Sequence, residues 1–282
     1  MEPIDHLVDI GVRLRVRQWP GNGRPFLLLH GLASNCRTWD RVAEHLHGAG
    51  HPVAAVDQRG HGLSDKPASG YDLKTVAADV TRLIERLGWD APILVGQSWG
   101  GTVVLQAAAL DPGLVTGIGC VDGGFLDLRR FPDPSWEAVS LRLKPPDLLG
   151  TPRAKIEKLL RTYHPEWDAA GIQATLENFE TLPDGTVRPW LSLEHHMTIV
   201  RSLWELDVPA LFSRVAEPVL LCVAEGSGMP AELLRDQVTA AETGLGSCTV
   251  RRFPGADHDI HVHRPRQLAA AFLEELESGI WS

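Results

Sequence analysis

The segment Gly96-Gln97-Ser98-Trp99-Gly100 constrains the fold of this chain more than any other. It directly follows the apolar run at 92–95 and directly precedes residues 102–110, whose pattern is typical of a helix. A serine in this position occupies a sharp turn, and glycines on both sides let strand and helix backbones approach closely. We therefore predict a strand, a tight turn and a helix, with Ser98 exposed at the carboxyl end of a parallel strand.

Short apolar runs recur along the rest of the chain and predict further strands that are covered on both faces. They lie at 26–29, 53–56, 93–95, 115–121 and 219–223. Helical patterns separate them, and the clearest runs from Leu73 to Leu87 between a capping residue, Asp72, and a terminating glycine, Gly88. Strands that alternate with helices predict a mostly parallel, doubly wound α/β sheet. The first residues, up to about 17, alternate as an antiparallel pair of strands would.

The alternation stops between about residues 125 and 207, and this segment predicts an inserted cap. Its pattern is helical from about 156 to 206, and it holds four of the nine tryptophans. We expect a core formed by residues 1–124 and 208–282, with a helical cap at 125–207. An apolar pocket roof is predicted from the aromatic residues of this segment, with Phe125, Trp136 and Trp204 as pocket residues.

Composition excludes several classes of partner. The formal net charge is −9, and no cluster of Lys and Arg forms the basic face that nucleic-acid binding needs. No apolar run is long enough to span a bilayer, and the first ten residues do not read as a signal peptide. The four cysteines are far apart, which suits reduced thiols. We expect a cytoplasmic protein that binds a small molecule and neither nucleic acid nor membrane.

A serine hydroxyl becomes a useful nucleophile when an imidazole takes its proton and a carboxylate orients that imidazole. His258 in Gly255-Ala256-Asp257-His258 follows the last strand-like run, so a loop at the correct edge of the sheet would carry it. The same region also contains His261 and His263, which makes a metal site the alternative interpretation. We prefer His258 as the base, with no metal, and expect the other two histidines at a helix entry or on the surface.

Two acids compete for the role of orienting His258. Asp122 ends the run at 115–121 and precedes two glycines, whereas Glu225 follows the next core strand. We prefer Asp122. Backbone N–H groups must also stabilise a developing oxyanion, and the sequence predicts those of Trp99, directly after the serine, and Leu32, in the loop after 26–29. His30, in the same loop, is expected to orient it through hydrogen bonds.

Taken together, these motifs resemble the α/β-hydrolase superfamily, and in particular its cap-bearing esterase, peroxidase-like and aminopeptidase-like branches. The resemblance rests on Leu28-Leu29-His30-Gly31, on the segment from Asp57 to Asp65, on the Ser98 turn and on Gly255-Ala256-Asp257-His258. It implies the α/β-hydrolase fold, Ser98 as nucleophile, His258 as base, and the chain order Ser, Asp, His. The segment from Asp57 to Asp65 is implied to be structural.

The chain departs from the family pattern at two positions. Many members carry the acid after the strand that corresponds to 219–224, where this chain has Ser227, and Asp122 fits the members that place it one strand earlier. Gln97 stands where relatives often have His, and we attach no function to it. Because serine occupies the turn, members that use an Asp nucleophile, such as epoxide hydrolases, are poor analogies.

The leading functional hypothesis is a serine hydrolase that cleaves a small or medium carboxylic ester, thioester or lactone without a cofactor. The alternatives within the fold are a C–C bond hydrolase and an aminopeptidase. The aminopeptidase would need cap carboxylates for the substrate ammonium, and Glu177, Glu180 and Glu194 are the candidates. A third alternative, from another class, is a non-catalytic receptor for a small ligand.

Overall fold

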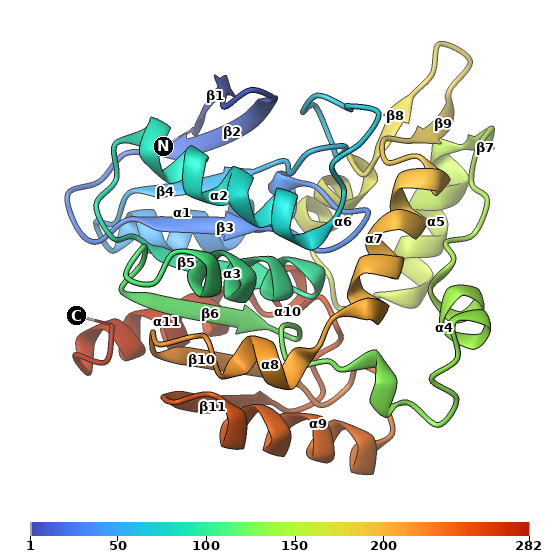
Figure 1. Ribbon diagram of the computed structural model, residues 1–282. Coiled ribbons are helices and arrows are strands. Elements are labelled where there is room, and N and C mark those ends of the chain that lie inside the picture. The colour runs from blue at the N-terminus through green and yellow to red at the C-terminus, as the bar shows by residue number, and fades with distance from the viewer. Residues whose placement is uncertain (1, 282) are drawn as a thin grey trace.

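A computed structural model describes residues 2–281, and its centre is an eight-stranded sheet with the order β1-β2-β4-β3-β5-β6-β10-β11. From β4 to β11 all neighbouring strands are parallel, while β2 runs antiparallel to both β1 and β4 (Figure 1). The strands are β1 Ile4–Asp9, β2 Arg13–Trp19, β3 Phe26–Leu29, β4 Val53–Val56, β5 Ile93–Gln97, β6 Gly117–Val121, β10 Val219–Ala224 and β11 Cys248–Phe253.

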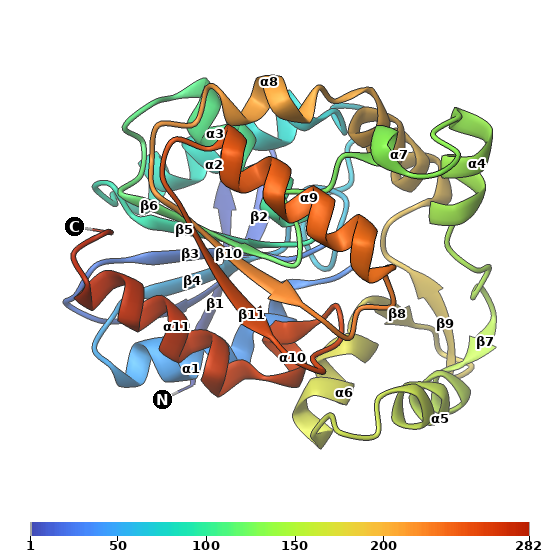
Figure 2. The same ribbon diagram turned by 90° about the horizontal axis from the view of Figure 1, so that it is seen from below.

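Helices cover both faces of this sheet, as Figure 2 shows. On one face lie α1 (Asp40–Gly48), α10 (Ile260–His263) and α11 (Pro265–Glu277), with the 3₁₀ helix η1 (Cys36–Trp39). The other face carries α2 (Leu73–Leu87), α3 (Trp99–Leu110), α8 (Val208–Phe212) and α9 (Ala231–Gly244). Strands β3 to β6 and β10 are buried along their whole length, which explains their continuous apolar sequences.

Local sequence explains why α2 begins and ends where it does. The Asp72 side chain accepts a hydrogen bond from the Thr75 N–H, which satisfies one free donor of the first turn. Gly88 follows the last turn with φ of 65°, a left-handed conformation that suits glycine. The predicted helix and the observed one have the same bounds.

Between β6 and β10 the chain forms a separate layer beyond the carboxyl ends of the strands (Figure 1). Its helices are η2 Leu128–Arg130, α4 Trp136–Leu143, α5 Arg153–Tyr163, α6 Ala169–Leu176 and α7 Leu193–Glu205. Three short strands, β7 Thr151–Pro152, β8 Phe179–Thr181 and β9 Thr186–Pro189, form a second sheet with the order β7-β9-β8.

The expectation that this layer is entirely helical is therefore wrong. Strands β8 and β9 form an antiparallel hairpin, and its turn contains Asp184 and Gly185, the latter with φ of 79°. An Asp-Gly pair between short strands is a hairpin signal that the helical interpretation overlooked. Within residues 2–281, no helix has the length and apolar character needed to cross a membrane.

Candidate active site

Ser98 sits in the tight turn between β5 and α3, as its flanking glycines predict. Its backbone has φ of 52° and ψ of −119°, and its N–H donates to the Val121 carbonyl at 2.9 Å. A Cβ added to Gly96 would lie 2.1 Å from the Gly100 carbonyl oxygen, so no side chain fits there. The turn therefore places Ser98 at the carboxyl end of β5 in a conformation that non-glycine residues rarely adopt.

Asp122 and His258 meet at the same edge of the sheet. Asp122 directly follows β6, and its Oδ2 lies 2.7 Å from His258 Nδ1. The other carboxylate oxygen accepts a hydrogen bond from the Ala224 N–H at 3.0 Å. Asp122 is buried, whereas the His258 side chain is 43% exposed. A carboxylate fixed in this way holds the imidazole with Nε2 free to accept a proton.

The competing acid, Glu225, lies elsewhere. It follows β10, and its side chain pairs with Arg252 at 3.4 Å on the exposed side of that loop. Of the two acids that the sequence offers, Asp122 is thus the one that contacts His258.

The electrostatic surroundings of His258 favour its protonated form. Burial alone would lower the pKa of His258, but the hydrogen bond to Asp122 and the charges of Asp259, Asp122 and Asp257 outweigh it and raise that pKa above its usual 6.5. An imidazolium at this position would therefore be stabilised.

Ser98 and His258 line one cavity of about 170 Å³. The other lining residues are Gly31, Leu32, Ala33, Ser34, Thr38, Gln97, Thr175, Asn178, Asp259 and Val262. Across residues 2–281, Ser98 Oγ makes no hydrogen bond, so its hydroxyl is free to rotate toward a ligand. Hydrogen bonds between catalytic groups commonly tighten only when substrate binds.

The predicted oxyanion donors are two backbone N–H groups without acceptors in the described chain. Trp99 is the first residue of α3, where helix geometry leaves the N–H free, and Leu32 lies in the cavity wall. Next to Leu32, Ala33 has φ of 60°, and its N–H donates to His61 Nε2 at 3.2 Å. Burial lowers the pKa of His61 to about 3, so this acceptor stays neutral.

His30 links the same loop to Gln58 through hydrogen bonds, as expected. Its Nε2 accepts a hydrogen bond from the Gln58 N–H at 3.1 Å, and its carbonyl accepts one from the Gln58 side chain at 2.7 Å. Burial lowers the pKa of His30 to about 4, which keeps the ring uncharged.

The loop that carries His258 is tied to both the core and the inserted layer. On the core side, Gln97 Nε2 donates to the His258 carbonyl at 3.2 Å, a role the sequence analysis did not assign to Gln97. On the other side, Asp257 Oδ2 accepts from Trp167 Nε1 at 2.8 Å and lies 3.1 Å from His164 Nδ1. No sequence pattern links these residues, because they are about 90 positions apart along the chain and meet only through the fold.

The three aromatic residues predicted to line the pocket lie elsewhere. Phe125 is packed into the core between sheet and helices. Trp136 and Trp204 pack on each other with ring centroids 5.8 Å apart, and the Arg201 guanidinium lies over both rings. Trp136 and Trp204 therefore pack between α4 and α7 and do not form a pocket roof.

A second, mainly apolar cavity of about 450 Å³ adjoins the first, and both are lined by Ala33 and Asn178. Its other lining residues are Lys144, Pro145, Pro146, Asp147, Leu148, Phe179, Pro189, Leu191, Leu193 and His196. The acids considered for an aminopeptidase are absent from the lining of either cavity. Glu177 and Glu180 pair instead with Arg153 and Arg188.

The other two histidines near His258 lie in α10, directly before α11, as the helix-entry expectation has it, and the surface alternative is wrong. His261 is fully buried in α10 against Trp39, with ring centroids 4.6 Å apart. The His263 side chain is 7% exposed and pairs with Glu166 at 2.7 Å. Within the described chain, no three His, Cys, Asp or Glu side chains converge as metal ligands.

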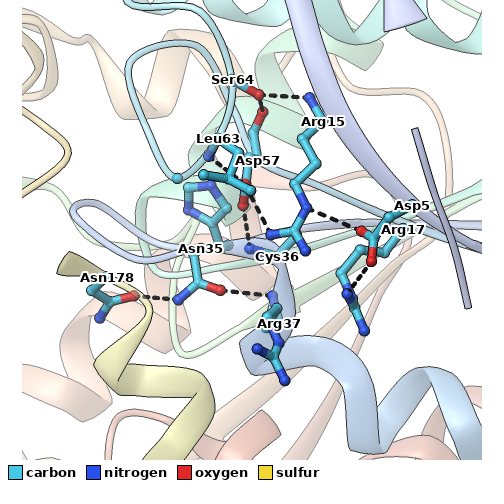
Figure 3. A network of polar contacts seen from close by, with 12 residues as sticks. Asp5, Arg15, Arg17, Asn35, Cys36, Arg37, Asp57, Leu63, Ser64 and Asn178 are labelled. Atoms are coloured by element: carbon cyan, nitrogen blue, oxygen red, sulfur yellow. Dashed lines mark hydrogen bonds and ion pairs between the residues drawn. The ribbon is translucent and has the colours of Figure 1, made fainter. Parts of the chain in front are cut away.

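The segment from Asp57 to Asp65 contains a buried carboxylate, Asp57, and Figure 3 shows the polar contacts around it. Asp57 accepts hydrogen bonds from the Cys36 N–H at 2.7 Å and the Leu63 N–H at 2.9 Å. Arg15 on β2 lies 3.5 Å from the same carboxylate. These contacts join β2, η1 and the loop after β4.

The chain matches the family model described as the alpha/beta hydrolase fold over residues 24–194, which is more than half of its length. It therefore belongs to the α/β-hydrolase family.

Individual relatives agree with this assignment. The chain is 31% identical to 2-(acetamidomethylene)succinate hydrolase of Mesorhizobium japonicum, covering 93% of this chain and 91% of the relative. It is 36% identical to a non-heme chloroperoxidase of Streptomyces lividans, covering 95% and 97%. A crystal structure of E-2-(acetamidomethylene)succinate hydrolase superposes with a TM-score of 0.82 at 29% identity, covering 98% of this chain and 99% of that one.

Proposed function

We propose that the protein is a serine hydrolase that cleaves a small or medium carboxylic ester, thioester or lactone through an acyl-enzyme. The observation that carries this proposal is the short contact between Asp122 and His258, on a loop that also lines the cavity around Ser98. Nucleophile, base and acid come from the ends of β5, β11 and β6, which meet at one edge of the sheet.

The reaction uses each residue in turn. Ser98 Oγ attacks the carbonyl carbon while His258 Nε2 takes its proton, and Asp122 stabilises the imidazolium that forms. The N–H groups of Leu32 and Trp99 receive the oxyanion. His258 then returns the proton to the leaving alcohol or thiol, and a water molecule, activated by the same imidazole, releases the acid and regenerates Ser98.

The two adjoining cavities support a substrate with unequal halves. The polar 170 Å³ cavity around Ser98 suits a compact group, and the apolar 450 Å³ cavity suits a larger hydrocarbon group. Both lie beneath the layer inserted between β6 and β10, which we propose acts as a cap. The apolar lining favours esters over strongly charged substrates.

Amide hydrolysis is the second candidate, because the relative from Mesorhizobium japonicum is named for a substrate with an acetamido group and a succinate group. A dicarboxylate needs cationic partners, yet Lys144 is the one Lys or Arg among the residues that line the two cavities. We therefore rank a neutral or singly charged ester first.

The decisive experiment compares wild-type protein with Ser98→Ala on aryl esters, thioesters and acetanilides. Loss of the serine is expected to lower kcat by roughly 10⁴- to 10⁶-fold. A fluorophosphonate probe is expected to label Ser98 in the native protein and to leave the variant unlabelled. Unchanged turnover in the variant, or labelling at another residue, would contradict the proposal. The ratio of ester to anilide turnover separates the two candidate substrates.

A further inference from the structure

One carboxylate in the cavity acts on the reaction described above only through its charge, which helps to raise the pKa of His258. Asp259 directly follows the base, His258, and lines the same cavity as Ser98. It precedes α10, yet its side chain does not cap that helix. Within residues 2–281, its carboxylate oxygens accept no hydrogen bond and pair with no cation. A partly buried carboxylate without a protein partner is available to a cationic group of a ligand in the cavity.

Two threonine hydroxyl groups in the cavity wall also present acceptors to the cavity. Thr38 Oγ1 donates to the Asn35 carbonyl at 2.8 Å, and Thr175 Oγ1 donates to the Gly171 carbonyl at 3.0 Å. Since each hydroxyl has one proton, its remaining lone pairs are available to a ligand. Donors also line the cavity. The Asn178 amide oxygen accepts from Asn35 at 2.6 Å, which leaves its NH₂ group available, and the hydroxyl groups of Ser34 and Ser98 are available too.

The charges around this cavity also favour a cationic ligand. No Lys or Arg lines this cavity, and His258 is neutral when it acts as a base. Burial first, and then the negative charges of Asp257 and Asp122, raise the pKa of Asp259, while His258 and His164 lower it. A bound cation would relieve this unfavourable environment.

We propose that Asp259, with Thr38 and Thr175, forms a subsite for a protonated amino group of the substrate, so that the preferred substrates are amino-substituted esters. This inference rests on the proposed serine hydrolase function and adds the substrate class. The 170 Å³ cavity admits only a small ammonium group close to the scissile carbonyl, with the larger apolar half of the substrate in the adjoining cavity. Asp259 acts here in binding and takes no proton in the reaction.

The test uses esters of equal shape that differ in charge. Ethyl glycinate and ethyl propanoate differ by an ammonium group on the acyl side. On the alcohol side, 2-(dimethylammonio)ethyl acetate and 3-methylbutyl acetate differ in the same way, and the charged ester keeps one N–H donor. A charge-assisted hydrogen bond predicts a kcat/KM roughly 10- to 100-fold higher for the charged ester of at least one pair. In Asp259→Asn the ratio of kcat/KM for the charged ester to kcat/KM for the neutral ester is expected to fall to about onefold. This ratio is the readout because loss of the Asp259 charge also alters His258, which affects both esters of a pair alike.

A matched control removes a carboxylate of similar position outside the cavity. Glu225 lies on the neighbouring loop after β10 and pairs with Arg252. The variant Glu225→Gln is expected to keep the wild-type preference for the charged ester. Wild-type protein that hydrolyses all four esters without favouring charge would overturn the ammonium subsite alone. The same conclusion follows if Asp259→Asn keeps the preference. Failure to hydrolyse any of the four esters would count against the serine hydrolase function and, with it, the subsite.

Discussion

At the scale of single residues, the site depends on how the carboxylates near His258 change its proton affinity. Because the pKa of His258 is raised, the neutral imidazole that acts as a base becomes abundant only above the usual value of 6.5. We expect kcat/KM to rise with pH through an apparent pKa above 6.5 and then to level off. A profile measured between pH 5 and 9 with a neutral aryl ester checks this, and a midpoint below 6.5 would contradict it.

Asp122 and Glu225 are expected to differ in their effect on kcat and on the apparent pKa. Asp122→Asn keeps the shape of the side chain but removes the charge that orients and stabilises the imidazolium, so kcat is expected to fall by about 10⁴-fold. The apparent pKa of the residual activity is also expected to fall, because a raising contribution has been removed. Glu225→Gln serves as the control and should leave both quantities unchanged.

At the scale of elements, the turn between β5 and α3 is the most constrained part of the chain. In Gly96→Ala the new methyl group would meet the Gly100 carbonyl at 2.1 Å, and neither backbone can move without displacing Ser98. We expect a loss of about 2–3 kcal/mol of unfolding free energy. Urea unfolding with a circular-dichroism readout measures it.

Gly48→Ala is the matched control for that substitution. Gly48 is the exposed last residue of α1, and an added Cβ there meets nothing within 4 Å. Alanine favours a helix over glycine, so this variant is expected to be unchanged or stabilised by up to about 1 kcal/mol. Equal losses in the two variants would show that the close approach at Gly96 is not the cause.

The sequence predicts those elements that are determined by interactions between residues close together in the chain. The bounds of α2 follow from Asp72 and Gly88, because capping is a local interaction between near neighbours. The contact of Asp122 with His258 follows from parallel strands whose carboxyl ends share one edge. These inferences need only local patterns and one topological rule.

Other features depend on long-range packing that a pattern does not encode. In the sequence, Trp136 and Trp204 cannot be told apart from tryptophans that line a pocket. The structure distinguishes them, because they pack on each other and on Arg201. His261 is buried although it lies in a polar-looking stretch, because α10 packs it against Trp39. The Asp184-Gly185 turn was a usable local signal for β8 and β9 that helical periodicity outweighed.

At the scale of the whole molecule, side chains of the inserted layer contact the loop that carries His258. Trp167→Phe removes the N–H donor to the Asp257 carboxylate while keeping an aromatic ring in place. Because hydrogen bonds to charged groups are strong, we expect a loss of about 2 kcal/mol in unfolding free energy and a lower kcat. Thermal unfolding and ester turnover measure the two effects.

Trp190→Phe is the comparison for this substitution. In the described chain the Trp190 ring nitrogen donates no hydrogen bond, and its ring faces Lys66 at 4.7 Å, a contact that phenylalanine retains in part. We expect little change in stability or turnover. A loss as large as that of Trp167→Phe would mean that ring size, and not the contact with Asp257, is responsible.

The double anchoring of the 257–258 segment has a consequence for inhibitors. Gln97 holds the His258 carbonyl from the core, while Trp167 and His164 hold Asp257 from the opposite side. A ligand too large for the cavity around Ser98 would have to separate the inserted layer from the core. This would strain the backbone between Asp257 and His258, because each residue is held by a different layer. Such a compound would lose binding free energy to this strain and would shift His258 when bound, so we expect both affinity and turnover to fall as the ligand becomes wider.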